Sequence, residues 1–409
     1  MKSLYYKIRG FAVTWLLRLL PRNQGVVFAG AGSAQTLCAQ ALLLGHRRIL
    51  VVTDAFLAGS GLLDSTLGQL EEGGADIAVF DGVEPDPLFE QVAAGVRALK
   101  AHQGDAVFAI GGGSVLDAAK LIALAANNPG DLAFFDGIQK AKKPGLPLFA
   151  LPTTAGTGSE TTPASVITES GSKRKVVVAD GKLVPHYVAL DARLMRTMPP
   201  RITAATGMDA LTHAVESWLS KASTDSTRDL AAAATRAIFE YLPRACRDGD
   251  DLEAREAMAM ASFQAGVAFG RTSVGYAHAV AHQLGRICGT PHGEANAMTL
   301  PGVLRAYGDC VHPLLAALAK RAGLANESDA DERAAERLIG RIESLRDELE
   351  LRLKPGGLSA EHVDELIRCR VGPVLGVLHA MQHGGPRQDD RAPAVRLAED
   401  DAALIRMFE

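Results

Sequence analysis

The first half of the chain alternates short, continuous apolar runs with longer stretches of helical spacing. The apolar runs lie at residues 48–54, 106–110, 146–151, 176–178 and 187–190, and residues 88–100 and 115–126 are examples of the helical stretches. Strands that are buried on both faces read as continuous apolar runs, whereas strands with one wet face alternate. The pattern therefore predicts an α/β domain with a parallel sheet covered by helices on both faces.

Strand signals nearly vanish after residue 198. Ala, Leu, Glu and Arg dominate residues 204–242, 252–270 and 330–353. A chain of 409 residues is long enough for two domains. We predict an α/β domain over residues 1–198, which binds a dinucleotide, and an all-helical domain over residues 199–409.

The N-terminus carries an apolar stretch at residues 11–20 that follows a basic start. The stretch is too short to span a bilayer and contains Arg18. It also lacks a small-residue cleavage site before Pro21. We interpret residues 1–20 as an extension with a packed or surface helix, not as a membrane anchor.

Composition excludes several classes of protein. Hydrophobic residues make up 47%, charged residues 22%, and the net charge is -4, so a basic nucleic-acid-binding face is not expected. The five cysteines are scattered and form no CxxC pair: Cys38, Cys246, Cys288, Cys310 and Cys369. A disulfide framework is therefore not expected, and a reducing cytoplasm is predicted.

A glycine-rich loop follows the apolar run at 106–110. The segment Gly111, Gly112, Gly113 and Ser114 opens a helical stretch, and Ser114 with Asp117 has the spacing of a capping box. Glycines let the backbone approach a ligand, and the free N–H groups of a helix start suit a pyrophosphate. The simpler alternative is a tight strand-to-helix turn, but the strand–loop–helix context favours phosphate binding.

Two further features at strand ends point to a nucleotide. Hydroxyls at Thr153, Thr154 and Thr157 follow the run at 146–151, where ligands gather in open α/β sheets; the alternative is a surface loop rich in Ser and Thr. Asp54 ends the first run. Its carboxylate is either a ribose ligand that favours NAD over NADP, or the N-cap of the next helix. Both readings of Asp54 stay open.

A set of spaced metal-ligand residues lies in the second half. Asp209 and His213 are four residues apart, as are His278 and His282, so each pair shares a helix face. His292 follows in a loop. One carboxylate and three of these four imidazoles suit a divalent first-row metal such as Fe²⁺ or Zn²⁺.

These motifs together resemble the iron-containing (type III) alcohol dehydrogenases. The matching segments are GGGSVLDAAK, LPTTAGTGSE, MPPRITAATGMDALTHAVES and HAVAHQLGRICGTPHGEANA, in family order between residues 111 and 298. The resemblance implies the α/β plus all-helical fold that the family shares with dehydroquinate synthase. It implies metal ligation by Asp209, His213, His278 and His292, and His282 as a proton-moving active-site residue. It further implies cofactor contacts from Gly111 to Ser114, Thr153, Thr154 and Thr157, and an NAD preference at Asp54.

The implied activity is NAD-dependent and metal-dependent alcohol oxidation. A hydride would pass between nicotinamide and a primary alcohol or diol held by the metal, or return to the aldehyde. Fe²⁺ is the first metal that the resemblance implies, and Zn²⁺ is the alternative. A homodimer or larger homo-oligomer is expected, with no nucleic-acid or membrane partner. The alternatives are a metal-independent relative of the maleylacetate reductase kind, an NAD-using synthase, and a non-catalytic nucleotide- or metal-binding protein.

Overall fold

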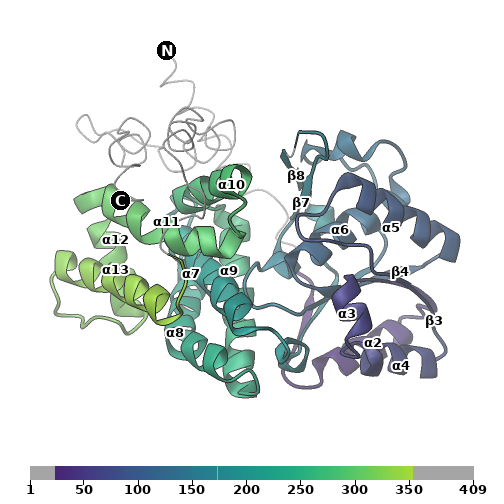
Figure 1. Ribbon diagram of the computed structural model, residues 1–409, viewed down its shortest axis with the longest axis horizontal. Helices are drawn as coiled ribbons and strands as arrows, with labels where there is room; N and C mark the ends of the chain where they lie inside the picture. Colours follow the sequence, from purple (N-terminus) through teal and green to yellow (C-terminus); the bar gives the residue numbers. More distant parts are fainter. Residues whose placement is uncertain (1–23, 173, 353–409) are drawn as a thin grey trace, which may run out of the picture. The chain divides into compact units, whose positions relative to one another are not determined.

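The structure, a computed structural model, describes residues 24–172 and 174–352 (Figure 1). These residues fall into two compact units. The α/β unit comprises the described residues up to Met198 together with Gly249–Phe263, and the helical unit comprises Pro199–Asp248 and the described residues from Gln264 onward. Gly249–Phe263 groups with the α/β unit although it follows residue 198 in the sequence. The predicted extension over residues 1–20 and the region beyond residue 352 lie outside the described residues.

The α/β unit is built on a six-stranded parallel sheet. Its strands are β1 (Val26–Ala29), β2 (Arg48–Val52), β3 (Asp76–Phe80), β4 (Ala106–Gly111), β6 (Leu148–Pro152) and β9 (Tyr187–Leu190). Their order is β1-β9-β6-β4-β2-β3, and every pair is parallel. Strands β4 and β6 are buried throughout. The predicted parallel sheet is thus confirmed.

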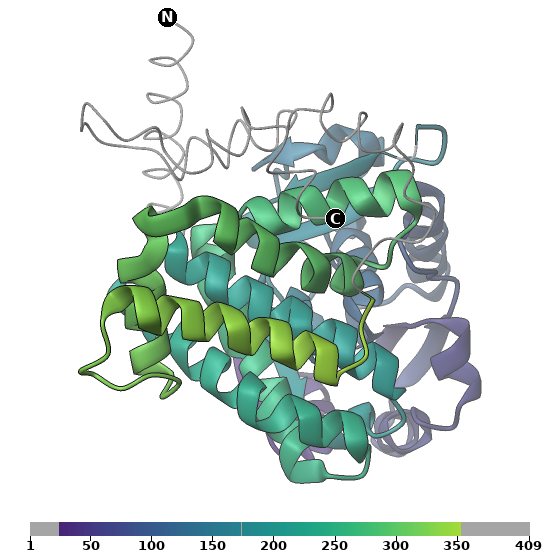
Figure 2. The same ribbon diagram turned by 60° about the vertical axis from the view of Figure 1, so that its left-hand side comes forward.

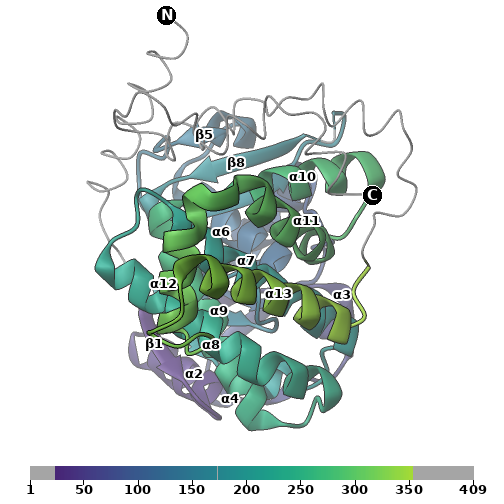
Figure 3. The same ribbon diagram turned by 90° about the vertical axis from the view of Figure 1, so that its left-hand side faces the viewer.

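Helices cover this sheet, and a smaller sheet stands beside it. The helices are α2 (Ser33–Leu43), α3 (Ala55–Gly59), α4 (Asp64–Glu72), α5 (Phe89–His102) and α6 (Gly113–Asn127), with short 3-10 turns η1 (Leu132–Phe135), η2 (Ser159–Thr161), η3 (Gly181–Leu183) and η4 (Ala192–Met195). The second sheet has the order β5-β8-β7, with β5 (Gly137–Ile138), β7 (Ala164–Thr168) and β8 (Lys175–Ala179). Figure 3 shows β5 beside β8. The apolar run at 176–178 therefore forms a strand of this smaller sheet, not of the main one.

The strand order creates a reversal point next to β2. The chain passes from β2 to β3 on one side, and then crosses back to β4 on the other side of β2. Ligands of open α/β sheets bind outside the carboxyl ends of strands at such a point. The residues that follow β2, β4 and β6 are therefore placed together, although they come from distant parts of the sequence.

The helical unit is built around α7. Its helices are α7 (Pro200–Leu219), α8 (Asp225–Arg247), the later part of α9 (Leu252–Thr272), α10 (Tyr276–Cys288), α11 (His292–Tyr307), α12 (His312–Arg321) and α13 (Asp331–Glu348), with a 3-10 turn η5 (Gly308–Val311). Helix α7 is buried along most of its length and packs against α8, α10, α11 and α12, while α13 lies against α12 (Figure 2). The described part of this unit contains no strand, as predicted. Among the described helices, none has the length and apolar character needed to cross a bilayer.

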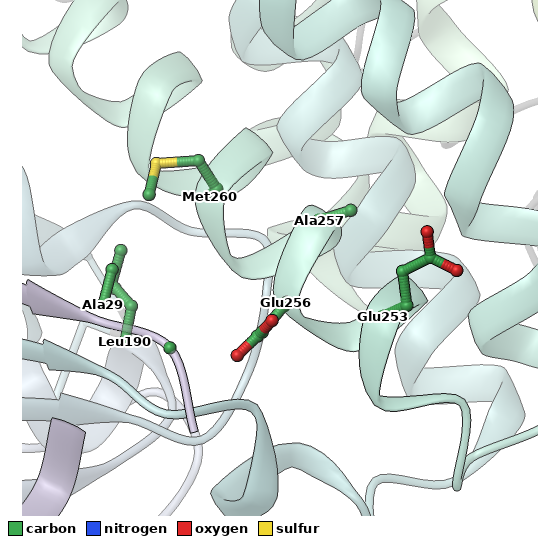
Figure 4. A pocket seen from close by; sticks show the side chains of 7 residues that line it. Ala29, Leu190, Glu253, Glu256, Ala257 and Met260 are labelled. Carbon is green, nitrogen blue, oxygen red and sulfur yellow. The ribbon is translucent and has the colours of Figure 1, made fainter. Parts of the chain in front are cut away.

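The first part of α9 is held to the α/β unit by polar contacts. Glu256 Oε1 accepts a hydrogen bond from the Ala31 amide at 2.7 Å, and Arg255, 1% exposed, donates to the Met198 carbonyl at 3.1 Å. A pocket lies beside Glu256 (Figure 4); it is lined by Ala29, Gly30, Leu190, Glu253, Glu256, Ala257 and Met260. The predicted site residues are not among its lining residues.

Candidate functional site

The glycine loop and the threonine loop meet in the α/β unit. The Thr153 amide donates to the Gly111 carbonyl at 3.0 Å, because β4 and β6 are neighbours. A Cβ atom on Gly113 would lie 2.7 Å from Thr157 Cγ2, which is too close for any side chain. Glycine at position 113 therefore lets the start of α6 approach the threonine loop. The first N–H groups of a helix have no intrahelical partner, so this arrangement suits a phosphate.

The capping box predicted at Ser114 is wrong. Helix α6 begins at Gly113, and its N-cap, Gly112, has no side-chain cap. Ser114 therefore lies inside the first turn. The Asp117 carboxylate accepts instead from the Ser159 hydroxyl at 2.6 Å and from the Val166 amide at 2.9 Å. Asp117 thus joins α6 to the segment after β6, which the local spacing could not reveal.

Lys120 is a buried cation that sequence reasoning did not single out. Its ammonium group, 1% exposed, donates to Ser159 Oγ at 2.8 Å, Thr162 Oγ1 at 2.9 Å and the Ala164 carbonyl at 2.8 Å. It also lies 3.6 Å from Asp117 Oδ1. The sequence feature that could have identified Lys120 is its place at the end of the glycine motif, on the buried face of the helix that follows. The network ties the threonine loop to α6.

Asp54 follows β2 and caps the next helix. Its Oδ1 accepts from the Leu57 amide at 2.9 Å, so Asp54 is the N-cap of α3. Of the two roles predicted for Asp54, the N-cap role is therefore confirmed. The role of Asp54 toward a ribose stays a prediction, supported by its place at the reversal point next to β4.

Three of the predicted metal ligands come together in the helical unit. Asp209 lies on α7, His278 near the start of α10, and His292 at the start of α11. Figure 1 labels these three helices. Their ligand atoms all lie within 4.8 Å of one another. Asp209 Oδ1 lies 3.4 Å from His278 Nε2 and 3.5 Å from His292 Nε2. Asp209 and His278 are each 2% exposed.

The other two histidines stand next to this cluster. The buried His213 ring stacks on His278 with ring centroids 4.4 Å apart, and on Phe269 at 4.0 Å. His213 is not part of the three-residue group, so its ligation stays a prediction. The exposed His282 ring lies 5.1 Å from that of His292.

The residues of the cluster shift one another's pKa values. Burial disfavours the charged form of Asp209, but the imidazoles of His213, His292 and His278 outweigh burial and hold the pKa of this carboxyl well below its usual range. Burial likewise opposes a charge on His278, but the Glu216 and Asp209 carboxylates prevail and raise its pKa to about 9. An ion bound here would replace the proton on His278, since metal ligands must be deprotonated.

The residues fit a divalent metal ion. Among the described residues, His278 Nε2 has no hydrogen-bond partner, although it is buried and lies beside Asp209. Its Nδ1 lies 2.7 Å from Glu216 Oε2, which leaves Nε2 to bind an ion. A carboxylate and two imidazoles form a donor set that Fe²⁺ and other first-row ions accept.

Two residues around the cluster were missed from the sequence. Glu216 lies seven residues after Asp209 on α7, and Asn296 lies four after His292 on α11; both spacings were visible signals. The Asn296 amide donates to Asp209 Oδ1 at 2.6 Å. Gly293 allows the close approach of these helices, because a Cβ there would lie 2.3 Å from the Ala205 carbonyl oxygen of α7.

A buried carboxyl beside Lys120 predicts a pH effect on stability. Burial raises the pKa of Glu160 from 4.5 to about 7, although the Lys120 ammonium opposes the rise. The folded protein then holds a proton that the unfolded chain has lost between these pH values. The free energy of unfolding therefore falls as pH rises from 4.5 to about 7.

Glu160→Gln removes this titration. Relative to wild type, we expect the variant to gain about 3 kcal/mol between pH 4.5 and pH 8, as follows from the shifted pKa. Urea denaturation across this pH range measures the difference. Parallel pH profiles for the two proteins would contradict the assignment.

The fold and the site together define a class of protein. The α/β unit holds a glycine loop and a threonine loop of the kind that binds nucleotides, and the helical unit holds a cluster of a carboxylate and imidazoles. A family model described as iron-containing alcohol dehydrogenase matches residues 25–192, and the model of the family's C-terminal part matches residues 203–371. The chain belongs to the iron-containing alcohol dehydrogenase family. It is an oxidoreductase that acts on alcohols and works with NAD and a divalent metal ion.

Individual relatives agree with this membership. The chain is 42% identical to the NAD-dependent methanol dehydrogenase of Bacillus methanolicus over 274 residues, covering 67% of this chain and 72% of the relative. It is 37% identical to alcohol dehydrogenase 4 of Schizosaccharomyces pombe over 357 residues, covering 86% and 83%. A crystal structure of a 1,3-propanediol oxidoreductase superimposes with a TM-score of 0.86 at 35% identity, covering 94% of this chain and 98% of the other.

Proposed function

We propose that this dehydrogenase interconverts a primary alcohol or a diol with the corresponding aldehyde. The observation that carries the proposal is the buried cluster of Asp209, His278 and His292, whose ligand atoms lie within 4.8 Å of one another. The substrate class is supported by the relatives named for methanol and 1,3-propanediol. Fe²⁺ is the proposed ion, with Zn²⁺ as the alternative for the same donors.

Each residue of the metal site has a proposed task. When bound, the metal supplies Lewis acidity toward an alcohol oxygen, and NAD supplies the carbon that takes the hydride. Asp209 contributes the negative charge, and His213, His278 and His292 contribute nitrogen donors. His282 is assigned the task of moving a proton between the site and solvent, which its exposure and the 5.1 Å between its ring and that of His292 support.

The NAD site is proposed for the α/β domain, residues 1–198, and the metal site for residues 199–409. The amides at Gly111–Ser114 would hold the pyrophosphate. The hydroxyls of Thr153, Thr154 and Thr157 would contact the cofactor, and Asp54 would contact the ribose and favour NAD over NADP. The contact between Gly113 and the Thr157 side chain supports a single binding surface made from both loops.

Metal removal and restoration test the proposal. The protein is purified anaerobically, its metal content is measured, and reduction of NAD⁺ and NADP⁺ is followed over a panel of alcohols and diols. We expect stoichiometric metal, loss of turnover on chelation, recovery with Fe²⁺ or Zn²⁺, and preference for NAD⁺. Turnover that survives chelation would favour a metal-independent reductase instead, and bound metal without any turnover would favour a synthase or a binding protein.

We further infer a cytoplasmic homodimer or larger homo-oligomer. The five cysteines are scattered along the sequence and form no CxxC pair, which supports a reducing compartment. The oligomer follows from the family resemblance. Light scattering on the purified protein measures its mass, and a monomer mass would contradict the inference.

A further inference from the structure

Glu216 joins two helices that carry metal-site residues. It lies in the last turn of α7, is 6% exposed, and accepts three hydrogen bonds from the start of α10. The Gly275 amide donates to Oε2 at 2.6 Å, the Ala277 amide donates to Oε1 at 2.6 Å, and His278 Nδ1 lies 2.7 Å from Oε2. Both carboxylate oxygens are therefore used.

The start of α10 depends on this carboxylate. The N-cap is Gly275, which has no side chain to cap the helix. The first amides of a helix lack intrahelical partners, and a negative charge near them is stabilising. Glu216 satisfies two of these amides from another helix, so α10 begins where α7 holds it.

The same carboxylate determines which nitrogen of His278 can bind an ion. A neutral imidazole carries one N–H, and a carboxylate can only accept. With the N–H on Nδ1 and directed at Glu216, the lone pair on Nε2 faces Asp209 Oδ1 at 3.4 Å. Carboxylates that hold ligating histidines in this way typically raise metal affinity by about 10- to 100-fold.

We propose that Glu216 is a positioning residue of the metal site, which orients His278 and anchors the start of α10. The inference rests on the proposed metal role of Asp209 and His278. Glu216 acts through His278 and needs no contact with the metal. Its side chain emerges from α7 on the face that carries Asp209 and His213, as the spacings of seven and three residues require.

Glu216→Gln tests the proposal with little change in side-chain volume. A glutamine has one acceptor oxygen where Glu216 has two, so its NH2 group must face either the Ala277 amide or the donors at Gly275 and His278 Nδ1. The negative charge that favours the N–H on Nδ1 is lost in either orientation. We expect the affinity of the metal-free protein for Co²⁺ or Zn²⁺ to fall by about 10- to 100-fold, measured by competition with a chelator. The visible spectrum of the Co²⁺ protein should change as well.

Ser220→Ala is the matched control for a merely structural effect. Ser220 ends α7, is 6% exposed, and donates to the Thr272 carbonyl at 3.0 Å without touching His278. The control should lower the unfolding temperature but leave metal affinity unchanged. An equal loss of metal affinity in both variants would overturn the proposal, as would wild-type affinity in Glu216→Gln.

Asp209→Asn separates this inference from the proposed function. If the Asp209→Asn protein binds metal as the wild type does, the proposed assignment of the metal site is wrong. If it loses metal while Glu216→Gln keeps wild-type affinity and the wild-type Co²⁺ spectrum, the site stands and the role of Glu216 is rejected.

Discussion

Asp209→Asn is expected to lower kcat/KM for alcohol oxidation by at least about 10³-fold, which corresponds to about 4 kcal/mol of lost transition-state stabilisation. The change removes the one negative charge of the three-residue cluster. Asp209 Oδ1, which carries that charge, lies 3.4 Å from His278 Nε2 and 3.5 Å from His292 Nε2. An asparagine oxygen can still accept from Asn296, so the contact between α7 and α11 is kept. Steady-state NAD reduction and metal content measure the effect.

Asp225→Asn is the matched control, because the same chemical change is made at an exposed position in the first turn of α8. It should keep wild-type turnover and metal content. Thermal unfolding of the metal-free proteins shows whether each variant folds. An Asp209→Asn protein that retains metal and turns over at the wild-type rate would remove Asp209 from the ligand set.

Lys120→Met is expected to destabilise the protein by about 3 to 5 kcal/mol, the range for removing one partner of a buried ion pair. The ammonium group is buried, and Ser159, Thr162 and Asp117 would lose their shared partner. Burial itself lowers the pKa of Lys120, while the Asp117 and Glu160 carboxylates counteract it.

The same substitution should weaken NAD binding, because the network ties the threonine loop to the helix that begins at Gly113. Urea denaturation measures the stability, and calorimetric titration measures the NAD affinity of the folded variant. Lys100→Met is the control, since Lys100 is exposed on α5. A Lys120→Met protein within about 1 kcal/mol of wild type, with unchanged NAD affinity, would show that the network is dispensable.

Local patterns in the sequence account for much of the fold. Continuous apolar runs predicted the buried strands β2, β4 and β6, because burial on both faces leaves no room for alternation. The edge strands β1 (VVFA) and β3 (DIAVF) were not predicted, although each carries a short apolar run; both contain exposed residues. The predicted capping box failed because α6 begins two residues before the start that an N-cap at Ser114 requires; its N-cap is Gly112.

The sequence by itself determined which chemical groups can form the site. Spacing along one helix is a local property, so Asp209 and His213, or His278 and His282, could be paired without knowing any long-range contact. The strand–glycine–helix context was equally local. These features predicted a nucleotide loop and a metal cluster, and they carried the family resemblance.

Only the tertiary structure decided which partners hold those groups in place. Glu216 and His278 are 62 residues apart, and Lys120 and Thr162 are 42 apart, so no local pattern connects them. The placement of Gly249–Phe263 with the α/β unit depends likewise on contacts distant in sequence. Buried charges and donors must find partners wherever the chain brings them, and that choice is made by the packing of helices and the order of strands.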